Sequence, residues 1–466
     1  MIERAVPRRD MTPVTPDAPD APGSGVPALP TSLLLLLAAL SACITAQGGY
    51  YSGGQLVTGV LLIAGLFSAV RAQPLSIDDL RFGPVLAAFA LAAWTLVVAT
   101  IVGGAAVPVL AMLAGIVAVL LICRRTSTAD RDGLAAALLG IGVLVALSGW
   151  VGVAWRLEPL TLEDQDLWRA ATTLTYSNAA AGLLVSLVLL SLGRQMSRPS
   201  SALRAVVTCL LLVGAGATLS RGGGMALVAG LVALAVLAGI RPATRALAPA
   251  SLGALVAVAG LALSMPNPAA VRPAVSALAL AAGLAVTVLL QRAPALVRSA
   301  TVALVLLVAT VGLLGPLDGT RRSITGARLS LASSDRSAQT SAALDLVAER
   351  PLTGTGPGRA TLFFAGPDGE PLAARYAHNE YLQMLAELGA VGLALVLVLA
   401  GTIARAVRAG RASASSPQLW AGAAAGLVAL AVHSGFDFLW HVPALPFAGA
   451  LLVGLTISAT KTKEHA

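Results

Sequence analysis

The sequence predicts an all-α fold whose helices cross a lipid bilayer many times, and two observations lead to this prediction. Of the 466 residues, 57% are hydrophobic and only 11% are charged, and the mean hydropathy is +0.84. A soluble domain is about half apolar and about one quarter charged. Apolar runs long enough to span a hydrocarbon core also recur along the whole chain, which predicts a polytopic membrane protein with about 12 to 14 transmembrane helices.

The predicted spans form two blocks separated by one long hydrophilic loop. The first block, within 31–315, has apolar runs at 31–48, 55–70, 83–102, 105–123, 133–155, 178–193, 205–220, 223–240, 247–265, 274–290 and 299–315. The second block, within 386–460, has runs at 386–404, 419–436 and 442–460. Residues 316–385 form the loop between them, which we expect to carry short helices and candidate catalytic residues. The tails, 1–30 and 461–466, lack an apolar period, and the Pro- and Asp-rich first tail is predicted to be disordered.

The basic residues predict the orientation of the spans. The formal charge is +9, but Lys and Arg punctuate the spans instead of forming one patch with exposed aromatic residues, which argues against nucleic-acid binding. The loops 194–204 and 405–411 are short, basic and poor in acidic residues, as cytoplasmic loops are. With these loops inside, both tails are cytoplasmic, and the longer segments 156–177 and 316–385 lie outside the cytoplasmic membrane.

Neither the cysteines nor the histidines predict a metal site. His433, Asp437 and His441 are spaced like a metal cluster, but they straddle the turn between the last two predicted helices. A structural zinc site would also need a fourth ligand. The three cysteines fall inside apolar runs, where small core residues are expected and a disulfide framework is not: Cys43, Cys123 and Cys209.

Arg221 is the first candidate for binding an anion. It lies in the stretch TLSRGGGMAL, between two closely spaced predicted spans and at their outer end. An arginine near hydrocarbon is costly unless it reaches the interface or binds an anion. The three glycines after it leave the backbone uncovered, so that a bulky headgroup can approach closely. The alternative is a simple interfacial anchor.

The outer loop has an excess of arginine, and Arg336 begins a predicted amphipathic helix. The fixed fork of donors on arginine suits phosphate and diphosphate better than the point charge of lysine, although a solvated surface is the alternative for most of these residues. Within residues 336–349, one helical face carries Ala338, Ala342 and Leu346, and we expect this face to lie on the membrane surface.

The motif GTGPGR at 354–359 predicts a tight turn and not a nucleotide loop, because no strand precedes it and no Lys-Ser or Lys-Thr pair follows.

His378 is the candidate base, in the stretch YAHNEYLQMLAELGAVGL at the polar end of a predicted span. Near neutral pH an imidazole accepts a proton from a hydroxyl, although an interfacial histidine is often only structural. Glu387 lies about 180° around an ideal helix from His378, so it cannot support the imidazole if the helix is continuous. Asp437, in the outer turn HSGFDFLWHVPALP, is a candidate to orient the imidazole. Asn379 and His433 are further candidates for supporting roles.

Five stretches of the chain resemble the O-antigen ligase and polysaccharide polymerase family, which comprises polytopic enzymes that act on undecaprenyl-diphosphate-linked glycans outside the cytoplasmic membrane. They fall within roughly residues 165–450, in the family order. The stretch that begins at Ala377 is the most specific, because its His-Asn pair is followed by spaced Leu, Glu and Gly residues. The five stretches are RAATTLTYSNAAAGLL from Arg169, TLSRGGGMAL around Arg221, SSDRSAQTSAALDLVAERPLTGTGPG from Ser333, AHNEYLQMLAELGAVGL from Ala377 and HSGFDFLWHVPA from His433.

This resemblance implies a metal-independent, inverting glycosyltransferase. Its donor would be a glycan on undecaprenyl diphosphate, and its acceptor a hydroxyl of a glycan or glycolipid. In this chain His378 would be the base, Arg221 and Arg336 would bind the diphosphate, and Arg169 would be a weaker third ligand. Relatives commonly carry an aromatic residue a few positions after the arginine that matches Arg336, and this chain does not. No cofactor is implied, because the sugar is already activated.

Two alternatives stay open at this point. One is a polysaccharide polymerase of the same family, since the sequence does not identify the acceptor. The other is a transporter or flippase for a polysaccharide or lipid, which would also have many helices and a basic outer vestibule. A transporter predicts ionisable residues in mid-membrane and a repeat between the two halves, and the sequence contains little of either.

Overall fold

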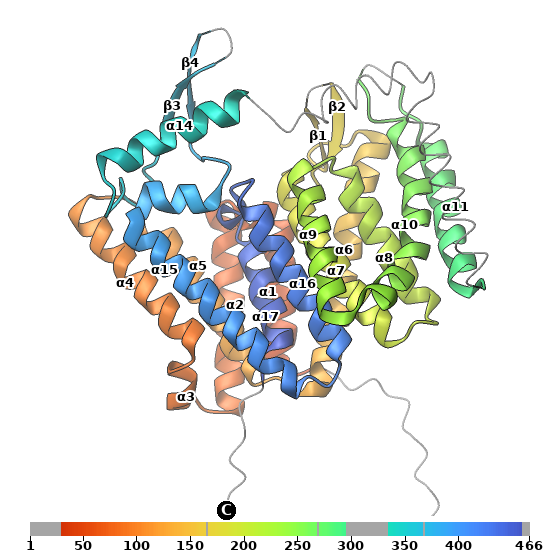
Figure 1. Cartoon of the computed structure of the whole chain (residues 1–466), viewed down its shortest axis with the longest axis horizontal. Helices are drawn as coiled ribbons and strands as arrows, with labels where there is room; N and C mark the ends of the chain where they lie inside the picture. Colours follow the sequence, from red (N-terminus) through yellow and green to blue (C-terminus); the bar gives the residue numbers. More distant parts are fainter. Residues whose placement is uncertain (1–28, 165, 268–269, 295–333, 367–368, 459–466) are drawn as a thin grey trace, which may run out of the picture.

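The computed structural model describes residues 29–164, 166–267, 270–294, 334–366 and 369–458. In these ranges the chain is a bundle of helices with two small β-hairpins (Figure 1). The longer helices are α1 (Thr31–Thr45), α2 (Ser52–Ala72), α4 (Gly83–Ile101), α5 (Ala106–Arg124), α6 (Thr128–Trp155), α7 (Ser177–Ser197), α8 (Ala202–Ala217), α9 (Arg221–Ala238), α10 (Ile240–Ala262), α11 (Pro273–Arg292), α14 (Ser334–Glu349), α15 (Glu380–Gly410), α16 (Pro417–Ser434) and α17 (Ala444–Thr456).

Nine helices within the described ranges are long and apolar enough to cross a membrane, and α1, α8 and α17 are shorter apolar helices. The predicted all-α polytopic fold is therefore confirmed. Each predicted span outside 299–315 overlaps a helix. The predicted span 299–315, residues 1–28 of the predicted tail 1–30, and the predicted tail 461–466 lie outside the described residues. The last block begins earlier than predicted, because α15 starts at Glu380 and not at 386.

The two β-hairpins were not predicted. The first pairs β1 (Thr161–Asp164) with β2 (Leu167–Ala170), and the second pairs β3 (Leu362–Ala365) with β4 (Pro371–Ala374). Four residues per strand give too few periods for an alternating pattern to stand out from a loop. Both hairpins and α14 lie at one end of the bundle (Figure 1). The described part of the outer loop, 334–366 and 369–385, therefore carries a hairpin besides the helix α14.

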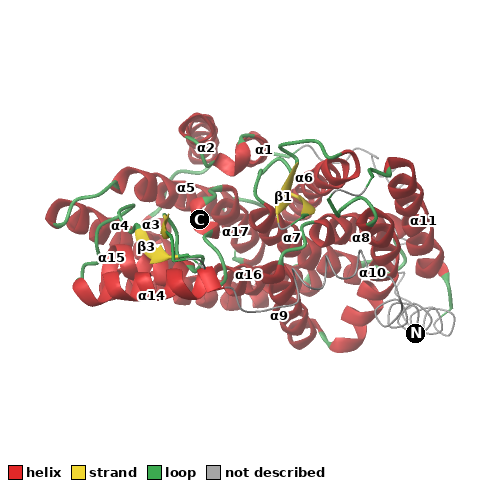
Figure 2. Cartoon of the chain, turned by 90° about the horizontal axis from the view of Figure 1, so that it is seen from above, coloured by secondary structure: helices red, strands yellow, loops and turns green. Residues whose placement is uncertain are grey.

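The bundle is elongated, with α16 and α17 near its middle, as Figure 2 shows from above. α16 packs against α7 and α9, α17 packs on α5, and α15 packs on α4. The apolar part of α7 is 94% buried, whereas the corresponding parts of α2 and α11 are 22% buried. α7 is thus a central helix, and α2 and α11 are peripheral helices with apolar faces left for lipid. The cysteines are buried and free, as predicted for core residues.

α15 is bent where it enters the bundle. Gly389 interrupts its helical geometry with φ 69° and ψ −173°, so a short first segment lies across the end of the bundle before the long segment descends (Figure 1). A Cβ at this position would clash with the carbonyl oxygen of Leu352. The backbone of the glycine-rich turn at 354–359 fills the bend, since the N–H of Thr355 donates to Ala386 O (2.9 Å) and the N–H of Gly356 donates to Glu387 O (3.0 Å). The predicted tight turn thus fastens the outer loop to the bundle.

The apolar face of α14 packs on protein and not on a membrane surface. Ala342 and Leu346 contact a small core formed by Ala343, Leu362 of β3 and Ala377. The helix predicted over 336–349 is present, but the expected location of its apolar face was wrong. The physical reason is that the hairpin β3–β4 offers an apolar surface that the sequence did not reveal.

The end of the bundle opposite the hairpins is tied by ion pairs. Asp79 accepts from Arg124 at 3.1 Å and from Arg125 at 2.6 Å, and Arg194 pairs with Asp132 at 2.9 Å. These arginines belong to the segments for which the charge pattern predicts a cytoplasmic location.

Candidate active site

His378 and Asp437 form the centre of the candidate site. The Nδ1 atom of His378 lies 3.0 Å from Asp437 Oδ1, although 59 residues separate them. His378 precedes the N-cap of α15, where the side chain of Asn379 accepts hydrogen bonds from the N–H groups of Tyr381 and Leu382. His378 has φ 48°, a left-handed conformation that is uncommon for residues other than glycine. This conformation directs the imidazole to the turn between α16 and α17.

Asp437 is held as a carboxylate by four donors. Besides His378, these are the hydroxyl of Tyr176 (2.6 Å), the side-chain amide of Asn178 and the N–H of Phe438 (2.8 Å). Burial alone would raise the pKa of Asp437, but the hydrogen bonds and the nearby imidazole lower it below the usual value. Burial and the neighbouring Asp437 carboxylate raise the pKa of Tyr176 well above its usual value, so this residue stays a donor.

The pair fixes the chemistry of the imidazole. An ionised carboxylate can accept a hydrogen bond but cannot donate one. Nδ1 of His378 therefore carries the hydrogen of the neutral ring and donates it to Asp437. The lone pair then lies on Nε2, the nitrogen that faces away from Asp437. A neutral imidazole oriented by a carboxylate can take a proton from a hydroxyl and is stabilised when it becomes charged.

Arg169 belongs to the same network from the other side. Its Nε donates to Thr218 O at 2.9 Å, one terminal nitrogen pairs with Asp164, and the other donates to Asn178 Oδ1 at 3.1 Å. Asn178 in turn donates to Asp437. Arg169 is 7% exposed. The hairpin β1–β2 therefore presents Arg169 to protein groups, and its link to His378 runs through Asn178 and Asp437.

Arg336 contacts the same turn, and Arg221 lies at the start of a helix that packs against it. One terminal nitrogen of Arg336, at the start of α14, donates to Phe436 O at 3.3 Å, next to Asp437. Arg221 is the first residue of α9, directly after the N-cap Ser220. Its neighbour Gly222 lies against Phe436 and His433. Arg336 of α14 and the first turn of α9, which carries Arg221, thus both lie beside the turn that carries Asp437.

The other predicted supporting residues do not contact His378. His433 is buried where α16 packs against Gly222 of α9 and Gly182 of α7. Glu387 accepts from Gln383 at 2.7 Å and from the N–H of Gly358 at 2.9 Å, which braces the bend of α15. Within the described residues, no three His, Cys, Asp or Glu side chains are grouped so as to hold a metal ion.

A second histidine–carboxylate pair was missed by the sequence analysis. His441 Nδ1 lies 3.3 Å from Glu380 Oε1. Although burial opposes the charged form, Glu380 raises the pKa of His441 above its usual value. Because His378 and Glu380 share one segment, and Asp437 and His441 share the other, the two pairs fasten these segments twice. Separations of 59 and 61 residues hide both pairs from any local pattern.

Aromatic rings fill the space between the two pairs. Phe438 is stacked between Tyr176 (4.9 Å between centroids) and Tyr376 (4.6 Å), and Tyr376 lies against His441 at 4.4 Å. The ring of His378 meets Phe438 edge-on at 5.0 Å. Stacking of this kind restricts ring motion, so the stacked rings hold the imidazole of His378 in place.

The sequence analysis also did not identify Tyr176 and Asn178. Both lie in the stretch RAATTLTYSNAAAGLL, whose polar start is the signal that could have identified them.

The site lies at a single end of the bundle. The hydroxyl of Tyr50, in the turn between α1 and α2, meets the hydroxyl of Tyr376 at 3.3 Å. Arg359 donates to Val102 O, between α4 and α5. Together with the α8–α9 and α16–α17 turns, these contacts bring four connections and both hairpins to the end that carries His378 (Figure 1). Arg221 and His378 are therefore on the same side of the bundle.

Comparison with known proteins agrees with the predicted resemblance. Residues 269–397 match the family model of the O-antigen ligases (Wzy_C). The matched segment contains Arg336 and His378, whereas Arg169, Arg221 and Asp437 lie outside it. No curated protein matches the chain. The match supports a membrane enzyme that transfers lipid-linked glycans, as O-antigen ligases and polymerases do.

Proposed function

We propose that the protein transfers a glycan from undecaprenyl diphosphate to an acceptor hydroxyl at the outer face of the cytoplasmic membrane, with inversion and without a metal ion. The observation that carries this proposal is the His378–Asp437 pair, whose histidine lies in the segment that matches the O-antigen ligase model and whose aspartate lies next to the contact of Arg336. The orientation rests on the distribution of basic residues.

His378 acts as the general base in this proposal. A sugar hydroxyl is a poor nucleophile, and removal of its proton during attack accelerates transfer. Nε2 of His378 takes the proton as the acceptor oxygen forms a bond to the anomeric carbon, and the bond from that carbon to the diphosphate oxygen breaks. Attack from the side opposite the leaving group inverts the anomeric centre. Asp437 stabilises the imidazolium that results.

Arg221 and Arg336 bind the diphosphate. The leaving group departs with its negative charge, so it needs cations more than it needs a proton donor. Guanidinium groups suit phosphate oxygens because they donate two parallel hydrogen bonds. The N-terminus of α9, where Arg221 lies, adds the positive end of a helix dipole. Arg169 acts differently from the third phosphate ligand that the resemblance implies, since its guanidinium contacts Asp164, Asn178 and the backbone oxygen of Thr218.

The test is transfer by the purified protein in lipid nanodiscs, with an undecaprenyl-diphosphate glycan as donor. A glycolipid core or a second donor molecule serves as acceptor, which separates ligation from polymerisation. We expect His378→Ala to lower the transfer rate by about 10²- to 10⁴-fold, the usual contribution of a general base. Asp437→Asn should lower it at least tenfold, because the imidazole loses its carboxylate partner. Wild-type transfer should be unchanged by EDTA.

The controls separate loss of chemistry from loss of fold. Both variants should insert into membranes and elute as the wild type does. Full activity of His378→Ala would contradict the assignment of the base. Passage of the donor across the bilayer, without a new glycosidic bond, would instead identify a transporter.

A further inference from the structure

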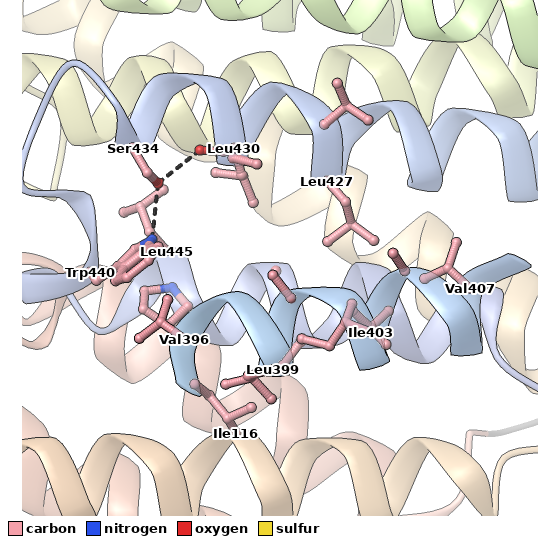
Figure 3. Close-up of a pocket in the computed structure, with 18 of the residues that line it drawn as sticks. Ile116, Val396, Leu399, Ile403, Val407, Leu427, Leu430, Ser434, Trp440 and Leu445 are labelled. Atoms are coloured by element: carbon pink, nitrogen blue, oxygen red, sulfur yellow. Dashed lines mark hydrogen bonds between the residues drawn. The ribbon is translucent and has the colours of Figure 1, made fainter. Parts of the chain in front are cut away.

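An apolar groove leads away from the candidate site along α15. Its volume is about 1190 Å³, and it lies between α15 and α16, with residues of α5 and α17 forming its floor (Figure 3). The α15 wall consists of Val396, Leu399, Ala400, Ile403, Ala404 and Val407. This spacing of three and four residues places the whole set on one face of the helix. The groove therefore follows the helix and is not a local gap at one turn.

One end of the groove adjoins the candidate site. Tyr381, Ser434 and Trp440 line this end, and the indole N–H of Trp440 donates to Ser434 Oγ at 2.9 Å. Tyr381 meets Trp440 edge-on at 5.5 Å and follows His378 by three residues. Trp440 likewise follows Asp437 by three residues, and the backbone N–H of Trp440 donates to the carboxylate of Glu380. The groove thus begins on the same two segments that hold the imidazole and its carboxylate.

The other end of the groove lies at the opposite side of the bundle, beside Arg408, Arg411 and Trp420. From Gly389 to Arg411, α15 rises by about 33 Å, which matches a hydrocarbon core about 30 Å thick. The acyl chains of one leaflet cross only half of that distance. A single ligand that fills the groove from end to end is therefore apolar and longer than the acyl chain of one leaflet.

We propose that this groove binds the polyprenyl chain of the donor along its length, so that the enzyme selects donors by the length of the lipid. The inference rests on the proposed function and concerns the part of the donor that does not react. With the diphosphate between the arginines and His378, the chain passes Tyr381 and Trp440 and continues along α15. Contact along the whole groove gives a long-chain donor more buried apolar area than a short-chain donor, and hence tighter binding.

The test uses one variant that blocks the groove and one matched control on the same helix. Ala404 lines the inner half of the groove and is exposed there, so Ala404→Trp fills the groove without entering the core. Leu397 is 55% exposed, is not among the lining residues, and serves as the control in Leu397→Trp. With an undecaprenyl donor, Ala404→Trp should raise KM at least tenfold and Leu397→Trp should not. With a donor whose chain is too short to reach residue 404, both variants should match the wild type.

A binding measurement tests the groove without any transfer reaction. A polyprenyl diphosphate with a photoreactive group at its far end should label the groove-lining residues of α15 and α16 in the wild type, in competition with undecaprenyl phosphate. Ala404→Trp should lose this labelling, and Leu397→Trp should keep it. If Ala404→Trp does not insert, the wild-type labelling decides alone.

Three results would overturn the proposal. These are equal KM values for the two variants with the long donor, labelling confined to lipid-facing surfaces, and competition by phospholipid as effective as that by undecaprenyl phosphate. Specific labelling of the groove in a protein that transfers no glycan would leave this proposal standing and reject the proposed function.

Discussion

His378 shows how single residues set the chemistry of this site. Its left-handed φ of 48° is costly for a residue with a side chain. The surrounding contacts, an N-cap at Asn379 and the carboxylate of Asp437, hold this conformation. Strained backbone of this kind is concentrated at functional sites. The strain at His378 is consistent with selection for the position of its ring.

Arg169 and Arg336 should respond differently to the same substitution. Arg169→Lys removes the guanidinium that contacts Thr218, Asp164 and Asn178. We therefore expect the free energy of unfolding to fall by about 1–3 kcal/mol and kcat to fall as well. Arg336→Lys keeps the charge but not the bidentate geometry, so KM for the donor should rise with little change in thermal stability. Thermal unfolding and steady-state kinetics of both variants separate the two roles. A rise in KM alone for Arg169→Lys would identify it as a phosphate ligand after all.

The bend of α15 is the element that positions the site. It places the first segment across the end of the bundle, where His378 meets the α16–α17 turn, and sends the second segment along the groove. The sequence indicated a polar head on an apolar helix but not an interruption, because a lone glycine inside a helical pattern does not by itself reveal its conformation.

Gly389→Ala tests this bend, with Gly401→Ala as its control in the same helix. A methyl group at residue 389 would clash with Leu352 O and would also be held at positive φ, so the variant should lose several degrees of thermal stability and most of its transfer activity. Nothing lies within 4 Å of a Cβ at Gly401. Gly401→Ala should therefore be neutral or stabilising by up to about 1 kcal/mol. Equal unfolding temperatures for the two variants would show that the bend does not depend on glycine.

The His441–Glu380 pair gives the joined segments a pH dependence. The pKa of His441 is higher in the folded protein than in the unfolded chain, so its stabilising contribution is complete below about pH 6.5. That contribution is lost as the pH rises through the folded pKa. We expect the wild type to lose thermal stability over this range and His441→Gln to lose less. Parallel curves for the two proteins, measured in detergent from pH 6 to 9, would show that the pair does not contribute.

The whole molecule carries the candidate active site at one end and the short basic loops 194–204 and 405–411 at the other. The charge pattern predicts that the end with His378 is outside the cytoplasm. The native cysteines are buried, which gives a low background for labelling. With a membrane-impermeant thiol reagent on intact cells, Pro371→Cys should be labelled and Ser415→Cys should be labelled only after lysis. The reverse pattern would put His378 in the cytosol and exclude an extracytoplasmic reaction.

Short motifs and the predicted topology identified most of the candidate residues, and the family resemblance added Arg169. His378, Arg221 and Arg336 came from short motifs that a reader of the sequence can recognise. Asp437 was proposed as the partner of an imidazole only because it lay in another outer turn. Tyr176, Asn178 and Glu380 were not identified, since their importance depends on partners from distant segments.

The sequence by itself determined that the chain is a helical membrane protein, where its spans lie and which end of each span is basic. Those properties follow from composition and from apolar runs, which are local and additive along the chain. Only the tertiary structure decided that Arg169 contacts protein groups, that His378 meets Asp437, and that a groove runs from that pair across the bundle. Such features arise from packing between helices far apart in sequence, and the free energy of packing depends on pairs of surfaces that no single segment contains.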